Sequence, residues 1–284
     1  MICWMNGKYI ESTELSISPT DHGYLYGLGF FETFRTYNDK TFLWNEHCER
    51  IQSALEEYRI KMSYTFEELR DVIIELNKRN GQTDGYFRLN ISAGEGGIGL
   101  SKTHYSNPNV IIFRKDLPTA LRGHEKNAVW LNTMRNSPEQ AIRYKSHHYA
   151  NNIRARFELS SLKELEGFFV NAEGHIAEGI TSNIFWVIKK ELYTPSISTG
   201  ILPGITRQHV LRLAHEAGLN IHEGKYKPQD LENADECFIT TSIQELIPIK
   251  KLDKKCFLGN AGEIYRQLHT MYIASIERSK KIES

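Results

Sequence analysis

Residues 175–185 read His-Ile-Ala-Glu-Gly-Ile-Thr-Ser-Asn-Ile-Phe, which sets one carboxylate between two apolar segments and beside hydroxyl-bearing residues. We expect this segment to belong to a cluster of strands that runs from residue 168 to residue 194. A carboxylate in such a place, here Glu178, must have a polar partner. The partner is either a structural hydrogen-bond donor or a protonated ring nitrogen of a bound ligand.

A second segment, residues 142–149, reads Ile-Arg-Tyr-Lys-Ser-His-His-Tyr. It follows an apparent short strand and precedes a predicted helix. Aromatic and histidine side chains surround Lys145, and a lysine in such surroundings loses hydration, as Schiff-base lysines require. Most lysines are simply solvated, so both interpretations stay open at this point.

Two predicted helix starts offer anion-binding chemistry. Residues 202–207, Leu-Pro-Gly-Ile-Thr-Arg, predict a loop that leads into a helix ending near Ala217. Gly204 allows close approach to the backbone, and the N–H groups of a first helical turn attract anions. Residues 240–242, Thr-Thr-Ser, end a strand, and 242–245 resembles a capping box. Each start alone is typical of an ordinary cap, but the two together favour a phosphate site.

Arg50 lies on the apolar side of a helix that we predict from Asn45, as its N-cap, to about Arg59. One face of this helix carries, at helical spacing, His47, Arg50, Ile51, Ala54, Leu55 and Tyr58. A buried guanidinium needs an anionic partner. That partner is a carboxylate of the chain or a phosphate or carboxylate ligand. The helical spacing alone favours the internal carboxylate.

The composition indicates a globular protein without charge bias. The 284 residues include 35 Lys and Arg and 35 Asp and Glu, which argues against a nucleic-acid scaffold and against an acidic tail. Hydrophobic residues make up 40% of the chain, enough for a large core. The cysteines (Cys3, Cys48, Cys237 and Cys256) lie far apart, so we expect neither a disulfide framework nor a zinc site. Because no signal peptide and no membrane-spanning stretch is evident, we expect a cytoplasmic protein.

The pattern of elements predicts two mixed α/β domains. Hairpins are expected around Asn6-Gly7 and Asn38-Asp39. Further elements are expected as helices over 45–59, 66–79 and 262–276 and strands over 87–92, 110–113, 128–131 and 237–240. Because residues 118–126 are polar and irregular, we expect a smaller N-terminal domain over 1–118 and a linker over 119–126. The larger C-terminal domain, over 127–284, would carry Lys145.

Two other patterns are weaker. Gly94, Gly96 and Gly99 form a GxGxxG motif after a predicted strand, but no helix start follows, so a loop between two strands is favoured over a dinucleotide site. His147 and His148 are adjacent and lack any metal-ligand spacing, so we expect no metal.

Together these segments resemble the pyridoxal-phosphate enzymes of fold type IV, over essentially the whole chain. That family includes branched-chain aminotransferases, D-amino-acid aminotransferases and 4-amino-4-deoxychorismate lyases. The resemblance is carried by His47-x-x-Arg50, Lys145-Ser146, Glu178-Gly179-x-x-Ser182-Asn183-Ile184-Phe185, Gly204-Ile205-Thr206-Arg207 and Thr240-Thr241-Ser242. It implies the two-domain α/β (mixed α+β) fold of the D-amino-acid aminotransferases, the cofactor pyridoxal 5'-phosphate (PLP) and a homodimer.

The resemblance also implies a role for each motif. Lys145 would form the Schiff base with PLP and move a proton, and Glu178 would keep the pyridine nitrogen protonated, so that the ring is an electron sink. Leu202 would pack against the ring. Branched-chain members direct a tyrosine toward the cofactor phenol oxygen, and Tyr149 lies near the corresponding position. Its spacing from Lys145 is one residue shorter than in those members. The phosphate would be bound by Arg50, Ile205, Thr206 and Thr241.

Within the family, residues 18–27, 31–35 and 145–149 are most similar to the aminodeoxychorismate lyases of Bacillus-type bacteria. Thr33 matches a threonine that lyases use near the reacting centre. D-amino-acid aminotransferases have a tyrosine in place of Phe31. They also have an arginine, followed two residues later by a histidine, at the positions where this chain has Ala93-Gly94-Glu95. Some lyases have an arginine in place of Ile98, so the candidates for binding substrate carboxylates are Arg88, Arg143 and Arg35.

We therefore expect a PLP-dependent lyase that converts 4-amino-4-deoxychorismate into 4-aminobenzoate and pyruvate in folate biosynthesis, with Lys145 and Thr33 at the reacting centre. The alternative is a D-amino-acid or branched-chain-type aminotransferase on the same fold. A protein that only binds the cofactor or a phosphorylated metabolite is disfavoured, because binding alone does not need both Lys145 and Glu178. The expected partners are a small substrate and a second copy of the chain, with no nucleic acid, membrane or metal.

Overall fold

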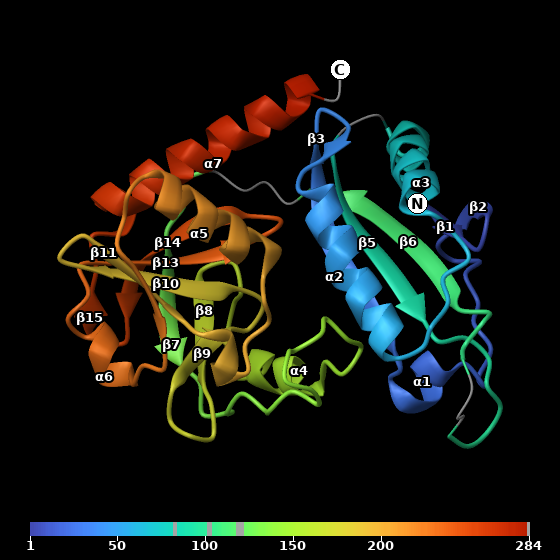
Figure 1. Cartoon of the computed structure of the whole chain (residues 1–284), viewed down its shortest axis with the longest axis horizontal. Helices are drawn as coiled ribbons and strands as arrows, with labels where there is room; N and C mark the ends of the chain where they lie inside the picture. The colour runs from blue at the N-terminus through green and yellow to red at the C-terminus, as the bar shows by residue number, and fades with distance from the viewer. Residues whose placement is uncertain (82–83, 101–103, 118–121, 283–284) are drawn as a thin grey trace. The chain divides into compact units, whose positions relative to one another are not determined.

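The computed structural model describes residues 1–81, 84–100, 104–117 and 122–282, which form two compact units (Figure 1). The N-terminal unit contains the described residues up to 117, together with 144–148 and 279–282, and the C-terminal unit contains 122–143 and 149–278. Residues 119–121 of the expected linker lie outside the described residues. In the described part of the chain, no helix is both long and apolar enough to cross a membrane.

The described residues of the N-terminal unit form a six-stranded antiparallel sheet. Its strands are β1 (Ile2–Met5), β2 (Lys8–Glu11), β3 (Gly29–Tyr37), β4 (Lys40–Thr41), β5 (Gly85–Ser92) and β6 (Asn109–Asp116), in the order β2-β1-β6-β5-β3-β4. Its helices are α1 (His22–Tyr26), α2 (Trp44–Glu57) and α3 (Phe66–Arg79). Both predicted hairpins are confirmed, since Asn6-Gly7 and Asn38-Asp39 all have positive φ, as two-residue hairpin turns require.

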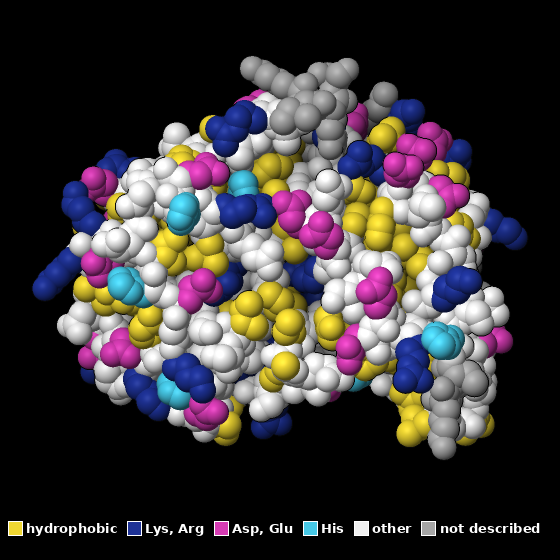
Figure 2. Space-filling model, viewed as in Figure 1, with side chains coloured by type: hydrophobic (Ala, Val, Ile, Leu, Met, Phe, Trp, Pro, Cys, Tyr) yellow, Lys and Arg dark blue, Asp and Glu magenta, His cyan; other side chains and the backbone are white. Residues whose placement is uncertain are grey.

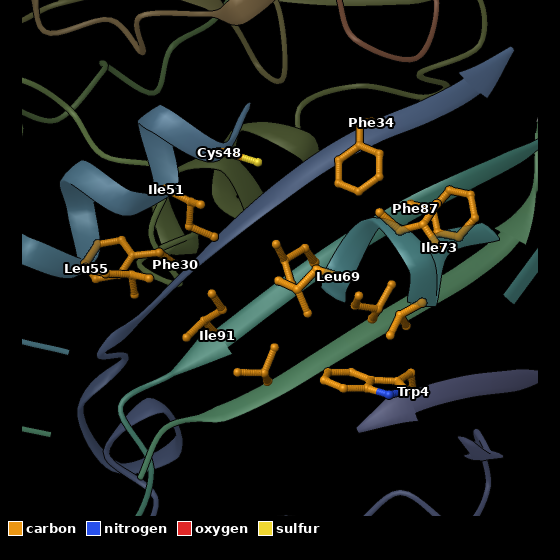
Figure 3. Packing of buried hydrophobic residues seen from close by; sticks show 14 of the residues in the cluster. Trp4, Phe30, Phe34, Cys48, Ile51, Leu55, Leu69, Ile73, Phe87 and Ile91 are labelled. Carbon is orange, nitrogen blue, oxygen red and sulfur yellow. The ribbon is translucent and has the colours of Figure 1, made fainter. Parts of the chain in front are cut away.

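The core of this unit lies between its sheet and the helices α2 and α3 (Figure 3). Phe34 of β3 stacks on Phe87 of β5, with ring centroids 5.8 Å apart, and Ile51 of α2 and Ile73 of α3 belong to the same cluster. Because strand side chains alternate between faces, the intervening residues point to the opposite face of the sheet. That face carries Phe31, Thr33 and Arg35 from β3 and Tyr86, Arg88 and Asn90 from β5.

The C-terminal unit is built on a mixed sheet of nine strands among its described residues. They are β7 (Lys126–Trp130), β8 (Leu165–Val170), β9 (Ile176–Gly179), β10 (Asn183–Ile188), β11 (Glu191–Pro195), β12 (Ile221–Gly224), β13 (Glu236–Thr241), β14 (Glu245–Leu252) and β15 (Lys255–Cys256). Their order is β12-β11-β10-β13-β14-β7-β8-β9, with β15 paired to β14. The helices are α4 (Ala150–Arg156), α5 (Ile205–Glu216), α6 (Pro228–Leu231) and α7 (Glu263–Ile282), of which residues 279–282 group with the N-terminal unit, with 3-10 turns at Ile197–Thr199 and Gly259–Ala261.

The pairing of β10 with β13 positions two turns of this unit. These strands are antiparallel, and Asn183 at the start of β10 lies opposite Thr240 near the end of β13. The segment that joins β9 to β10, residues 178–183 with the adjoining strand ends (the Glu178 turn), therefore lies beside the segment that joins β13 to β14, residues 241–244 (the Thr241 turn). Large apolar side chains such as Phe168, Trp186 and Ile239 are fully buried beneath them and hold the strands in place.

Four local expectations differ from the structure. Helix α2 begins at Trp44 after Leu43, whose φ of 57° makes it the cap, so Asn45 is inside the helix. Residues 242–245 make a turn into β14 and not a capping box, because Glu245 has φ of 62° and starts a strand. The segment before Lys145 is not a strand. Lys145 itself groups with the N-terminal unit and not with the C-terminal domain, for a reason given below.

Charged side chains are interspersed on the visible surface. Figure 2 shows Lys and Arg beside Asp and Glu over most of the face in view, without a large area of one sign. This agrees with the equal numbers of the two charges in the sequence.

Candidate active site

Lys145 lies at the edge of strand β3. The N–H of Phe31 donates to the Lys145 carbonyl at 2.9 Å, and the N–H of His147 donates to the Gly29 carbonyl at 2.9 Å. Phe30 and Ser146 form an antiparallel bridge between these two bonds. The segment 144–148 thus extends the N-terminal sheet, which explains its membership of that unit.

The ring of Phe31 is contacted by two cations. Lys145 Nζ lies 4.7 Å from the ring centroid, and Arg88 Cζ lies 3.6 Å from it. Thr33 points to the same face as Phe31 and lies directly across from Arg88 in the β3–β5 register. The two residues expected at the reacting centre, Lys145 and Thr33, are therefore on one face of the N-terminal sheet.

His147 completes this face. Its ring stacks on Phe31 with centroids 6.3 Å apart, and its Nε2 is 3.0 Å from Asn90 Oδ1. Burial, and then the charge of Arg88, lower the pKa of His147 to about 4. At neutral pH this imidazole is uncharged, so it adds no positive charge beside Lys145.

Arg50 has an internal anionic partner. Its Nε and Nη2 donate to the two carboxylate oxygens of Glu32 at 2.8 and 2.6 Å, and His47 Nδ1 lies 2.6 Å from the same carboxylate. Burial alone would raise the pKa of Glu32, but Arg50 and His47 lower it to about 2. The interpretation that the helical spacing favoured is thus confirmed. Glu32 was not predicted, although a carboxylate inside the apolar run of residues 30–34 is the signal that could have identified it.

Glu178 is paired with an arginine that the sequence analysis missed. Arg135 Nε donates to Glu178 Oε1 at 2.8 Å, and both side chains are about 6% exposed. The Nη1 group of Arg135 also donates to Asn151 and Asn152. No periodic pattern surrounds Arg135, so the sequence offered no signal for this pair.

The second oxygen of Glu178 connects it to the loop before α5. Its Oε2 accepts from the N–H of Leu202 at 2.9 Å, while Asn183 Nδ2 donates to the Leu202 carbonyl at 3.0 Å. A Cβ atom on Gly204 would lie 2.0 Å from Asn183 Oδ1, so the loop needs glycine at this close approach. Two of the predicted cofactor residues, Glu178 and Leu202, are therefore in direct contact, and they fix the loop that starts α5.

Hydroxyl groups gather at the start of α5 and the end of β13. Ile205 and Thr206 are the first residues of α5, and Thr206 Oγ1 lies 3.4 Å from Ser242 Oγ. Thr241 Oγ1 accepts from the N–H of Gln244 at 2.8 Å. The buried hydroxyl of Thr240 has no hydrogen-bond partner among the described residues. Such an arrangement offers donors to an anion, because the N-terminal N–H groups of a helix attract negative charge.

The remaining candidates are placed as follows. Tyr149 is the N-cap residue of α4 in the C-terminal unit. Arg143 is buried beside Arg135 and donates to the carbonyls of Gly200 at 2.6 Å and of Asn136. Burial, and then Arg135, lower the pKa of Arg143 to about 10. Its main-chain contacts make it a residue that fixes the 200–204 loop and not a substrate anchor. Arg35 lies over Tyr37, with Cζ 4.4 Å from the ring centroid.

Comparison with known proteins places these residues in a family. Residues 29–252 match the family model described as amino-transferase class IV. The chain is 38% identical to the aminodeoxychorismate lyase of Bacillus subtilis (strain 168), over 96% of this chain and 94% of that one.

Two solved structures have the same fold. The branched-chain aminotransferase of Thermoproteus uzoniensis, with norvaline, has a TM-score of 0.88 at 26% identity, covering 99% of this chain and 96% of that one. The T.th. branched-chain amino acid aminotransferase, complexed with N-(5'-phosphopyridoxyl)-L-glutamate, has a TM-score of 0.84 at 25% identity, covering 97% of this chain and 93% of that one.

The residues present fit PLP on structural grounds. The buried Thr240 hydroxyl lacks a partner among the described residues, and Gly204, the N-cap residue of α5, has no side chain to cap the first N–H groups of the helix. Glu178 is a buried carboxylate, the type of group that pairs with a pyridine nitrogen. The expected fold, family and cofactor are confirmed: the chain belongs to the class IV aminotransferase family of PLP-dependent enzymes.

Proposed function

We propose that this protein is an aminodeoxychorismate lyase, which converts 4-amino-4-deoxychorismate into 4-aminobenzoate and pyruvate for folate biosynthesis. The observation that carries the proposal is the 38% identity to the Bacillus subtilis lyase over nearly the full length of both chains. The phenylalanine at position 31 and the threonine at position 33 support the lyase within the family.

We propose that the residues named for PLP have the following roles toward it. Lys145 binds its aldehyde carbon, Glu178 holds its pyridine nitrogen protonated, and Leu202 packs against its ring. Tyr149 is directed toward its phenol oxygen. The phosphate is held by Arg50, Ile205, Thr206 and Thr241. When bound, PLP supplies an electron sink for negative charge that develops on a substrate carbon.

In the proposed reaction, the substrate amine would replace Lys145 at PLP, and the Lys145 amine freed in this way would remove the proton from C4 of the substrate. The electron pair left at C4 forms the C3–C4 double bond as the C3–O bond breaks, so that the ring becomes aromatic. The three-carbon group leaves as enolpyruvate and takes up a proton to become pyruvate. Thr33, on the same face as Lys145, is suited to donate a hydrogen bond to the departing oxygen.

Arg88 is the candidate that the geometry favours for a substrate carboxylate. It lies over Phe31, whose ring Lys145 also contacts, and its side chain donates to the neutral amide of Asn90 at 3.2 Å. A guanidinium can bind a carboxylate through two parallel hydrogen bonds. Arg35, two residues beyond Thr33 on the same face of β3, is the second candidate.

The proposal is tested by incubating the PLP-loaded protein with aminodeoxychorismate and identifying the products. A lyase releases 4-aminobenzoate without any amino acceptor. If 4-aminobenzoate is not formed by yellow, PLP-loaded protein, the lyase assignment is wrong.

The second candidate is an aminotransferase, because two solved structures with the fold of this chain are branched-chain aminotransferases. It would use the same lysine and carboxylate but would need an amino donor and a 2-oxo acid. Stoichiometric conversion of the bound cofactor into pyridoxamine phosphate by a branched-chain or D-amino acid, in protein inactive as a lyase, would favour it.

We also propose that the protein acts in the cytoplasm as a homodimer. Apolar side chains exposed on the N-terminal unit, Tyr24, Ile98 and Leu100, support a second copy as the partner. Light scattering coupled to size-exclusion chromatography would measure the mass directly.

A further inference from the structure

Two buried charges lie beneath the cofactor-binding turns of the C-terminal unit, outside the residues assigned above. Lys126, at the start of β7, is 5% exposed, and Glu166, in the neighbouring parallel strand β8, is 2% exposed. Burial raises the pKa of Glu166 and lowers that of Lys126, while each charge favours the ionised form of the other. Buried charges are costly, so a pair in this position calls for an explanation.

Glu166 holds the Glu178 turn. Its Oε1 accepts from the N–H of Ile180 at 3.0 Å, two residues after Glu178, and from the N–H of Gly167 at 3.2 Å. The packing is tight, because a Cβ atom on Gly179 would lie 2.1 Å from Ser182 Oγ and 3.0 Å from Glu166 Oε1. A change at Glu166 is therefore transmitted to the backbone that carries Glu178.

Lys126 holds the Thr241 turn. Its Nζ donates to the Leu162 carbonyl at 2.8 Å and to Gln244 Oε1 at 3.4 Å. The N–H of Gln244 in turn donates to Thr241 Oγ1 at 2.8 Å. Lys126 is thus one residue removed from a hydroxyl assigned to the phosphate.

We propose that Lys126 and Glu166 are positioning residues that together set the two cofactor-binding turns relative to each other, Glu166 through the Ile180 N–H and Lys126 through Gln244. The inference rests on the proposed roles of Glu178 and Thr241 and adds the residues that act through them. Neither side chain touches the cofactor, so the pair acts on how firmly PLP is held and on the environment of its pyridine nitrogen.

The test measures the rate at which the holoenzyme releases PLP, and it does not depend on product formation. Loss of visible absorbance is followed after dilution into cofactor-free buffer, and the pH midpoint of the visible band is measured. We expect Lys126→Met to accelerate release about tenfold, because a buried hydrogen bond to the phosphate turn is lost. We expect Glu166→Ala to accelerate release and also to shift the pH midpoint, because the backbone that carries Glu178 moves.

Two further variants separate positioning from folding. Glu236→Gln changes another buried carboxylate of this unit, which accepts from the N–H groups of Ile264 and Tyr265 at the start of α7. It should lower the melting temperature and leave PLP release unchanged. The double variant Lys126→Met/Glu166→Gln removes both charges at once and so avoids an unpaired buried charge. It should fold and still release PLP faster.

The proposal would be overturned by two results found together in the folded double variant and in every folded single variant. These are a rate of PLP release within twofold of that of the unmodified holoenzyme and an unchanged pH midpoint of the visible band. Because the readout is PLP retention, a holoenzyme that holds PLP but forms no 4-aminobenzoate would count against the lyase and not against the Lys126–Glu166 pair.

Discussion

At the scale of single residues, the surroundings of Phe31 explain how one lysine can be presented for chemistry. The segment 144–148 is tied to β3 by two backbone hydrogen bonds, so the Lys145 Cα has a fixed position at the sheet edge. Its Nζ contacts an aromatic face, and the neighbouring His147 is neutral at pH 7. Holding a reacting group in one geometry on a rigid element lowers the entropic cost of the reaction.

Replacing Lys145 tests this presentation. We expect Lys145→Ala to abolish turnover and the visible absorbance of the PLP-loaded protein, because the amine that binds the cofactor is lost. The matched control is Lys115→Ala, which removes an exposed lysine 4.2 Å from the Tyr86 ring and should keep full activity. Full activity of Lys145→Ala would contradict the assignment.

His147 predicts a pH dependence of stability. Because its folded-state pKa is lowered from 6.5 to about 4, the unfolded chain binds a proton more readily between these values. The stability that the neutral imidazole contributes is therefore complete above pH 6.5 and is lost as the pH falls toward 4. Denaturant unfolding measures the free energy of unfolding of the unmodified protein and of His147→Asn. We expect the difference between the two to shrink by up to about 3 kcal/mol as the pH falls through this range. If the stability difference from His147→Asn stays constant between pH 6.5 and pH 4, the prediction is wrong.

At the scale of elements, α2 is held to β3 by the cluster of Glu32, His47 and Arg50. The carboxylate lies in the strand and both of its partners lie in the helix, so the three residues fix how the helix sits on the sheet. Since the pKa of Glu32 is lowered to about 2, this stabilisation is present above pH 4.5 and is lost as the pH falls from there toward 2.

Removing the carboxylate should loosen both helix α2 and Arg50, the residue of that helix that we propose binds the phosphate. We expect Glu32→Gln to lower the free energy of unfolding by about 3 kcal/mol, because the Arg50 guanidinium is left without its buried counter-charge. Cofactor retention should fall with it. Glu11→Gln, which removes a half-exposed partner of the N-terminal amine, should cost much less, because water screens exposed ion pairs. Equal losses in the two variants would show that Glu32 does not hold α2.

Elements with strong local signals could be predicted from the sequence. The hairpins at Asn6-Gly7 and Asn38-Asp39 and the helix Phe66–Arg79 follow from turn residues and helical spacing. Leu43 and Glu245 could not be predicted, since tertiary packing imposes a positive φ on residues that avoid it. The partners Arg135 and Glu166 are equally long-range, so no local pattern indicated them.

At the scale of the whole molecule, the residues proposed for PLP and substrate belong to two units of one chain. The N-terminal unit carries Lys145, Thr33 and Arg50, and the C-terminal unit carries Glu178 and the hydroxyls around Thr241. The motifs of the C-terminal unit were visible in sequence because each lies where a strand or loop ends. The unit to which Lys145 belongs could not be predicted from the sequence. The segment 144–148 joins the N-terminal sheet through backbone hydrogen bonds, which any sequence could make.

The lyase and the aminotransferase differ in what the whole molecule needs for repeated turnover. A lyase regenerates its starting state after each substrate, whereas an aminotransferase stops after one half-reaction unless a 2-oxo acid is supplied. The most direct measurement is therefore the molar yield of 4-aminobenzoate and pyruvate from aminodeoxychorismate, per PLP-loaded site, with no 2-oxo acid present. We predict equal amounts of both products over many turnovers. No product, or product that stops at one equivalent per site, would contradict the central claim.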